Sequence, residues 1–167
     1  MVHDQYSTKQ YYLADTETTQ KMGQGLANHW LQTSSNDRPR VWYLAGDLGA
    51  GKTTFSQAFI KTLMQDATLR VKSPTYTLIE SYESDTADCR VLHADLYRLV
   101  EAEELEYLGF RDLEMQADVL LIEWPSKGEG FLPKADIILD LSISDTGRYL
   151  NIKTFDSCMQ DWLARFD

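Results

Sequence analysis

Continuous apolar runs and helical stripes alternate along the chain. The runs Val41–Ala45 and Val119–Glu123 are short and almost wholly apolar, which predicts buried strands. In Lys52–Met64 the large apolar residues recur every four positions, which predicts an amphipathic helix. The other expected elements are a strand ending at Tyr11–Leu13, a helix capped by Asp15 or Thr16, strands at Thr75–Tyr82 and Arg90–Ala94, a helix at Glu101–Leu108 ending at Gly109, a hairpin of Ile137–Ser144 and Arg148–Phe155, and a closing helix at Cys158–Phe166.

This alternation predicts the α/β class, with a largely parallel central sheet, flanking helices and an added antiparallel hairpin. The chain has 167 residues, of which 43% are hydrophobic, so it contains enough apolar material for a packed core. No repeat, linker or biased tract divides the sequence, and we expect residues 1–167 to form a single domain.

The charge balance argues against direct binding of nucleic acid. Lys and Arg number 16 against 26 Asp and Glu, which gives a net charge of −10. Such a chain repels phosphates and anionic membranes, so we expect neither DNA nor a membrane as a partner. The first ten residues contain no apolar segment of signal-peptide length, and Cys89 and Cys158 have no metal-binding spacing. A cytoplasmic protein with reduced thiols is therefore expected.

The strongest motif lies directly after the run Val41–Ala45. Residues 46–53, Gly-Asp-Leu-Gly-Ala-Gly-Lys-Thr, fit the P-loop pattern G-x-x-x-x-G-K-[ST] at every fixed position. In such a loop the glycines let backbone N–H groups approach phosphate oxygens, the lysine reaches the β- and γ-phosphates, and the hydroxyl ligates Mg²⁺. We therefore predict ATP or ADP and Mg²⁺ as ligands of a P-loop NTPase-type domain. The predicted nucleotide-binding residues of the loop are Gly46, Asp47, Gly49, Ala50, Gly51, Lys52, Thr53 and Thr54.

Two acidic residues at the ends of predicted strands are candidates for the metal and the attacking water. Glu123 follows Val119-Leu-Leu-Ile122 in the manner of a Walker B strand, and Asp95 follows the strand Arg90–Ala94. The sequence does not decide between them, because strand order determines which acid lies beside Thr53.

Three further features near these motifs carry weaker predictions. The hydroxyl-rich segment Ser73-Pro-Thr-Tyr-Thr77 has the place of a switch that senses the γ-phosphate, although an ordinary Ser-Pro turn is the alternative. Trp124 fits either the core or a nucleotide contact. His93 is interpreted as a structural, hydrogen-bonded residue rather than a ligand or base.

Five segments together resemble one known family. They are GDLGAGKTT at 46–54, SPTYTL at 73–78, HADLYRL at 93–99, EELEYLG at 103–109 and IEWP at 122–125. In this order they resemble the TsaE family, formerly YjeE, the bacterial ATPases needed for synthesis of tRNA threonylcarbamoyladenosine. The resemblance is dense from residue 44 to residue 133 and weak towards both ends of the chain.

The resemblance implies a P-loop domain that binds ATP and Mg²⁺ and hydrolyses ATP slowly by itself. It also implies action with TsaB- and TsaD-like proteins, which modify adenosine 37 of tRNAs reading ANN codons, so that tRNA is contacted through the partners. The resemblance further implies that Lys52, Asp95 and Glu123 are catalytic residues and that Thr53 and Glu123 bind the metal ion. Trp124 and, more weakly, Arg148 lie at the nucleotide, and the switch comprises Ser73, Thr75, Tyr76 and Thr77.

Three other classes of P-loop protein are alternatives to this interpretation. A GTPase is disfavoured because the chain lacks an Asn-Lys-x-Asp signature and an Asp-x-x-Gly motif. A P-loop small-molecule kinase is the main alternative, but such kinases bring clustered lid arginines to the phosphate. The arginines of this chain are scattered, at positions 38, 40, 70, 90, 98, 111, 148 and 165. The third class is a binding module whose docking to a partner is switched by nucleotide. It differs from the family interpretation only in whether the pathway requires ATP turnover.

Overall fold

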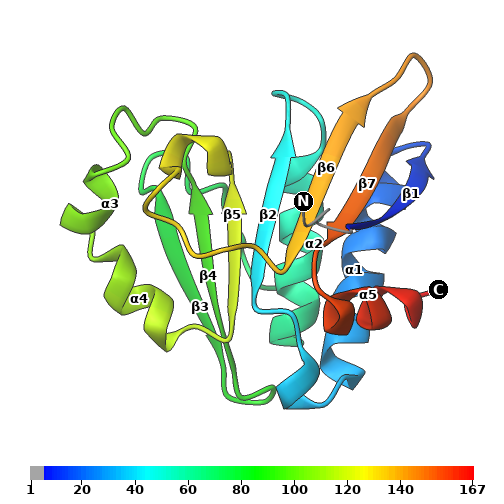
Figure 1. Cartoon of the computed structure of the whole chain (residues 1–167), viewed down its shortest axis with the longest axis horizontal. Coiled ribbons are helices and arrows are strands. Elements are labelled where there is room, and N and C mark those ends of the chain that lie inside the picture. Colours follow the sequence, from blue (N-terminus) through cyan, green and yellow to red (C-terminus); the bar gives the residue numbers. More distant parts are fainter. Residues whose placement is uncertain (1–5) are drawn as a thin grey trace, which may run out of the picture.

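A single mixed sheet organises the chain in the computed structural model, which describes residues 6–167 (Figure 1). The expectation about the first ten residues therefore lies in part outside the described residues. The strands are β1 (Ser7–Leu13), β2 (Val41–Gly46), β3 (Ile79–Ser84), β4 (Cys89–Asp95), β5 (Val119–Glu123), β6 (Ile137–Ile143) and β7 (Arg148–Thr154). The helices are α1 (Thr16–Gln32), α2 (Lys52–Met64), α3 (Glu104–Tyr107), α4 (Phe110–Gln116) and α5 (Ser157–Ala164), with 3₁₀ turns at Ser35–Asp37 and Pro125–Gly128.

The strand order is β1-β7-β6-β2-β5-β4-β3. The four central strands, β6, β2, β5 and β4, run parallel, whereas β3, β7 and β1 join the two edges in antiparallel orientation. The predicted α/β class is confirmed, including the antiparallel hairpin formed by β6 and β7. Parallel strands bring their carboxyl ends to one edge of the sheet, and in open α/β sheets ligands bind there.

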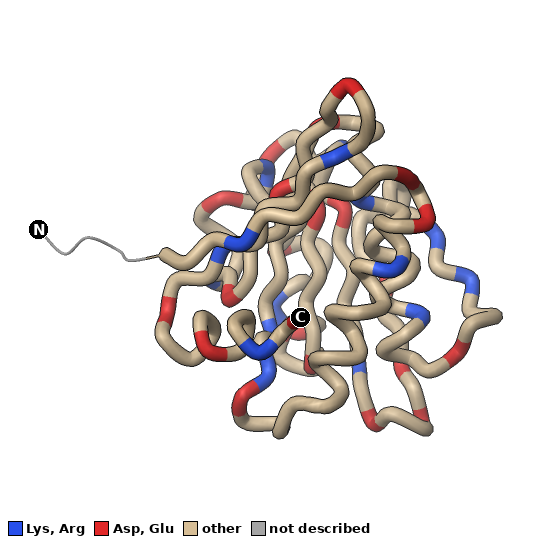
Figure 2. The backbone as a smooth tube through the Cα atoms, turned by 90° about the vertical axis from the view of Figure 1, so that its right-hand side faces the viewer, with Lys and Arg blue, Asp and Glu red and all other residues tan. Residues whose placement is uncertain are grey.

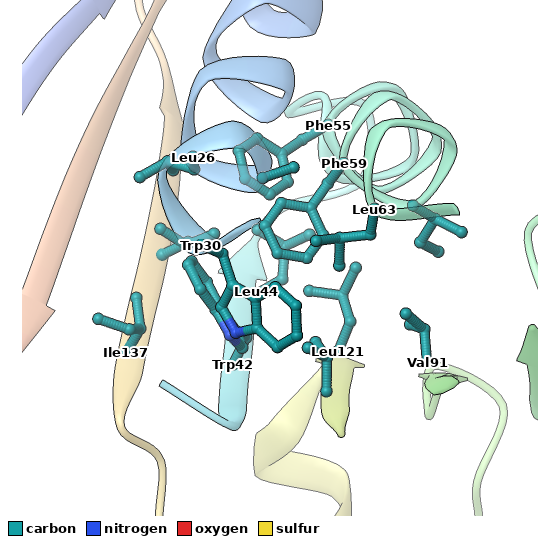
Figure 3. Close-up of a cluster of buried hydrophobic side chains, with 14 of the residues drawn as sticks. Leu26, Trp30, Trp42, Leu44, Phe55, Phe59, Leu63, Val91, Leu121 and Ile137 are labelled. Carbon is teal, nitrogen blue, oxygen red and sulfur yellow. The ribbon is translucent and has the colours of Figure 1, made fainter. Parts of the chain in front are cut away.

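Two hydrophobic clusters cover the sheet on its opposite faces. The larger cluster packs α1 and α2 on β2, β5 and β6, and its central side chains are Leu26, Trp30, Trp42, Leu44, Phe55, Phe59, Leu63, Val91, Leu121 and Ile137 (Figure 3). The smaller cluster packs α3 and α4 on the other face through Leu92, Ala94, Leu105, Phe110, Leu120 and Ile122. Successive residues of β4 and β5 alternate between the clusters, as strand geometry requires.

Close packing of α1 on α2 fixes the helix that follows the P-loop. A Cβ added at Gly23 of α1 would lie 2.8 Å from the carbonyl oxygen of Phe55, so only glycine permits this approach. The N-terminus of α1 is capped by Asp15, one of the two residues predicted for this role, which accepts a hydrogen bond from the Thr18 amide at 2.8 Å. The cysteines Cys89 and Cys158 are both free thiols, also as expected.

Two predicted elements differ from the structure. The strand predicted at Thr75–Tyr82 is wrong at its start, because residues 75–77 form a turn closed by the Leu78 amide on the carbonyl oxygen of Pro74 at 2.7 Å. The helix predicted at Glu101–Leu108 is only the short α3. Its start is shortened because the Glu104 carboxylate accepts from the backbone amides of Val100 and Glu101, which places these residues before the helix. Gly109, with φ of 71°, does end α3, but α4 follows it at once and was not predicted.

Candidate functional site

The P-loop joins the carboxyl end of β2 to the N-terminus of α2. Gly46, Gly49 and Gly51 have φ angles of 141°, 80° and 103°, in the region that favours glycine. A Cβ at Gly46 would collide with the carbonyl oxygen of Leu141 on β6. The conformation therefore depends on these residue types, as the motif predicted, and it brings backbone N–H groups and the positive end of α2 to one place.

The side chain of Lys52 lies across the base of this loop. Its Nζ donates to the carbonyl oxygens of Gly46 at 2.5 Å and Asp47 at 2.7 Å. The same atom lies 4.5 Å from the centre of the Trp124 ring, within cation–π range. Burial lowers the pKa of Lys52, and the nearby carboxylates of Glu123 and Asp95 oppose that shift. The ammonium group is thus held beside the phosphate-binding loop.

Strand order places the two candidate acids side by side. Asp95 and Glu123 are register partners on β4 and β5, and Glu123 is also the partner of Leu44 on β2. Because β5 lies between β2 and β4, Glu123 is on the strand next to the P-loop strand and Asp95 is one strand farther away. Both side chains are almost fully buried, at 1% and 6% exposed, on the face that α2 covers.

Asp95 connects β4 to the predicted switch segment. Its Oδ2 accepts hydrogen bonds from the Ser73 hydroxyl at 3.1 Å and the Thr75 hydroxyl at 3.4 Å, and its Oδ1 accepts from the Tyr97 amide at 3.1 Å. Burial raises the pKa of the Asp95 carboxyl, while the bonds from Tyr97 and Ser73 lower it. These contacts draw residues 73–75 towards the acid, which is a further reason why this segment does not extend as a strand.

A cavity of about 340 Å³ opens between the P-loop, the switch segment and the carboxyl ends of β4 and β5. Its lining includes most of the residues predicted from sequence: Gly49, Gly51, Lys52, Thr53, Thr54, Ser73, Thr75, Asp95, Glu123, Trp124 and Arg148. Five predicted residues do not line it, namely Gly46, Asp47, Ala50, Tyr76 and Thr77. Tyr76 is 83% exposed, and its ring lies 4.4 Å from the guanidinium carbon of Arg98.

Leu48 and Tyr97 also line the cavity and were not singled out from the sequence. Tyr97 stands two residues after Asp95 and its ring lies 5.0 Å from that of Trp124. Its place in the HADLYRL segment was the available signal. Leu48 occupies a variable position of the P-loop pattern, and no signal in the sequence identified it.

Arg148 reaches the P-loop from the first residue of β7. Its Nη2 donates to the carbonyl oxygen of Gly49 at 3.1 Å. Its Nε is buried, and among the described residues it has no hydrogen-bond partner. A cation with an unused donor beside the loop suits an anionic ligand, and the hairpin of β6 and β7 supplies it from far along the sequence.

His93 differs from its predicted role. It is fully buried, but neither ring nitrogen forms a hydrogen bond within residues 6–167, so the expectation of a hydrogen-bonded residue is wrong. Its neighbours on β4 and β5 are apolar except at the acidic end, where its Nε2 lies 3.7 Å from Oε2 of Glu123.

The oxygen-bearing side chains at the cavity fit a metal ion that is bound jointly by protein and phosphate oxygens. In the part of the chain that the structure describes, no three His, Cys, Asp or Glu side chains form a cluster suited to a metal ion. Mg²⁺ at phosphate sites is held by one or two carboxylates together with phosphate oxygens and water. The cavity offers the exposed hydroxyl of Thr53 with the carboxylates of Glu123 and Asp95, which is consistent with that mode of binding.

A glycine-dependent loop between a parallel strand and a helix, with a lysine and strand-end acids around one cavity, defines a P-loop protein of the α/β class. The family model described as "Threonylcarbamoyl adenosine biosynthesis protein TsaE" matches residues 13–150. The chain belongs to the TsaE family.

Similar proteins agree with this assignment. A Haemophilus influenzae protein is 39% identical over 141 residues, 84% of this chain and 86% of that protein. An Aquifex aeolicus protein is 34% identical over 140 residues, 84% of this chain and 91% of that protein. Both are named tRNA threonylcarbamoyladenosine biosynthesis protein TsaE.

The crystal structure of YdiB from Bacillus subtilis has the same fold. It aligns with a TM-score of 0.73 at 22% identity and covers 97% of this chain and 95% of its own. Within residues 6–167 the helices are too short or too polar to cross a lipid bilayer.

Proposed function

We propose that this protein binds ATP with Mg²⁺ and hydrolyses it slowly by itself, as a single cytoplasmic domain that serves threonylcarbamoyl modification of tRNA. The observation that carries the proposal is the convergence of the P-loop, Lys52 and two strand-end carboxylates on one cavity of a TsaE-family chain. The modified nucleoside would be adenosine 37 of tRNAs that read ANN codons, in keeping with the family resemblance.

Each group at the cavity receives a role from its position. The loop amides, Lys52 and Arg148 hold the phosphates, and Thr53 and Glu123 hold Mg²⁺, which neutralises phosphate charge when bound. Asp95, one strand farther from the loop, orients the water that attacks the γ-phosphorus. Trp124 and Tyr97 form an aromatic wall beside the phosphates. Catalysis is then electrostatic positioning, because phosphoryl transfer requires little covalent chemistry from the protein.

Partner proteins are required because the surface does not suit tRNA. The lysines and arginines of the traced chain are interspersed with aspartates and glutamates and form no extended basic run (Figure 2). With a net charge of −10, the protein would repel the phosphates of tRNA. We therefore assign tRNA binding to TsaB- and TsaD-like partners. The switch segment, which bonds to Asp95, would report the state of the nucleotide to them.

The expected result of a turnover assay separates this proposal from a small-molecule kinase. ATP incubated with the protein alone should give ADP and inorganic phosphate in equal amounts at a low rate. A TsaB–TsaD-like pair should raise that rate, because a partner arginine at a P-loop site accelerates turnover by about 10³–10⁵-fold. The measurement is phosphate release together with mass spectrometry of the products. Transfer of the γ-phosphate to a hydroxyl compound, with no effect of the partners on turnover, would contradict the proposal.

A further inference from the structure

Ser56 places a hydroxyl group against the carboxylate of Glu123. It lies one turn after Lys52 on α2 and is fully buried. Its Oγ lies 3.1 Å from Oε1 of Glu123 and 2.8 Å from the carbonyl oxygen of Lys52, and it can donate its one proton to either. Hydrogen bonds to an ionised carboxylate are roughly twice as strong as neutral ones, so the bond to Glu123 is favoured when that group is charged.

His93 lies against the other oxygen of the same carboxylate. Strand alternation puts His93 and Asp95 on one face of β4, next to Glu123 on the neighbouring strand. The Nε2 of His93 is 3.7 Å from Oε2, and both ring nitrogens are buried without a hydrogen-bond partner among the described residues. A buried polar group without a partner is costly, and native proteins retain few of them. A role beside a candidate metal ligand is one of the explanations for such an exception.

The two side chains lie against different oxygens of the Glu123 carboxylate, Ser56 within hydrogen-bond distance of Oε1 and His93 3.7 Å from Oε2. Ser56 comes from the helix and His93 from the strand, and each is packed in place by neighbouring elements. Groups that hydrogen-bond to a metal-binding carboxylate orient it, as Ser56 can, and removal of such groups typically costs 10–100-fold in metal affinity. A carboxylate that is 1% exposed has few other ways to keep one orientation towards the cavity.

We propose that Ser56 and His93 are positioning residues that fix the Glu123 carboxylate in the orientation that receives Mg²⁺. The inference rests on the proposed function, since it assumes that Mg²⁺ binds together with the nucleotide. Neither residue lines the cavity, so both act through Glu123 and touch neither nucleotide nor metal.

The test is the gain in ADP affinity that Mg²⁺ confers, measured by calorimetry in EDTA and in excess Mg²⁺. Ser56→Ala should reduce this gain about 10-fold and leave ADP affinity in EDTA unchanged, because the P-loop contacts remain. His93→Leu should reduce the gain similarly without lowering the thermal unfolding midpoint, since it removes two unpaired buried nitrogens. Glu123→Ala, which removes the carboxylate itself, should abolish the Mg²⁺-dependent gain in ADP affinity and so sets the lower limit for comparison.

Thr62→Ala is the matched control. Thr62 is on the same helix and makes the same kind of bond, from its hydroxyl to the carbonyl oxygen of Ala58 at 2.9 Å, but far from any carboxylate of the cavity. It should keep the whole Mg²⁺ gain. If the parent protein shows no gain, the proposed function is contradicted. If the parent shows the gain and either Ser56→Ala or His93→Leu retains it in full, the positioning role is overturned, and a Ser56→Ala protein that fails to fold leaves His93→Leu to decide.

Discussion

Lys52→Ala is expected to weaken ATP binding by about 100-fold or more and to remove measurable hydrolysis. Two hydrogen bonds from a charged donor to phosphate oxygens contribute roughly 1.5–3 kcal/mol each, and each 1.4 kcal/mol is a factor of ten in affinity. The Nζ atom already lies at the base of the loop, where Gly46 and Asp47 carbonyl oxygens and the Trp124 ring hold it. Calorimetric titration with ATP and Mg²⁺ measures the effect.

The fold should survive this substitution, because Lys52 belongs to neither hydrophobic cluster and its ammonium group contacts only the loop carbonyls and the ring of Trp124 at the rim of the smaller cluster. Circular dichroism during thermal unfolding verifies that. Lys61→Ala is the matched control, since Lys61 is on the same helix, in a groove between α1 and α2 away from the cavity. Parental affinity and turnover in the Lys52→Ala protein would show that the loop does not hold phosphate.

Asp95→Asn is expected to lower ATP turnover by about 10²–10⁴-fold, the usual worth of a positioned acid–base group, while nucleotide affinity stays within a few-fold of the parent. The amide is nearly isosteric. Its oxygen can still accept from the Tyr97 amide, and its NH2 group, in the place of Oδ2, can donate to the hydroxyl oxygens of Ser73 and Thr75. The loss would therefore come from the missing charge at the water, not from a displaced segment. Single-turnover kinetics with saturating ATP separates the chemical step from binding.

Asp140→Asn on β6 is the control for loss of a carboxylate charge elsewhere, because Asp140 is partly exposed, lies 3.8 Å from Lys153 and does not line the cavity. It should turn over ATP at the parental rate. If the Asp95→Asn protein also hydrolyses ATP at the parental rate, Asp95 does not orient the attacking water.

The central elements of the fold could be predicted because their patterns are local. The bounds predicted for α2 and β5 are those observed, since an amphipathic stripe and a continuous apolar run each specify an element without reference to the rest of the chain. Residues 73–78 could not be assigned in that way. Their β-forming composition is overridden by hydroxyl bonds to Asp95, a residue about twenty positions later.

The candidate site was predictable in its residue types but not in its arrangement. The P-loop pattern identified Lys52 and Thr53, and strand ends identified Asp95 and Glu123. Which acid lies next to the loop depends on β5 being inserted between β2 and β4, and no local pattern encodes strand order. Ser56 and His93 were not recognised as neighbours of Glu123, because a buried serine in a helix and a lone histidine in a strand have no signature of their own.

The most direct test of the proposed function is the number of threonylcarbamoyladenosines formed per partner complex. Purified protein, ATP, a TsaB–TsaD-like pair, a threonylcarbamoyl donor and tRNA reading ANN codons would be combined, and the modified nucleoside counted by mass spectrometry. We predict many rounds of modification with the parent protein and no sustained modification with Lys52→Ala or Asp95→Asn. Equal yields from the parent and both variants, or from reactions that lack the protein altogether, would contradict it.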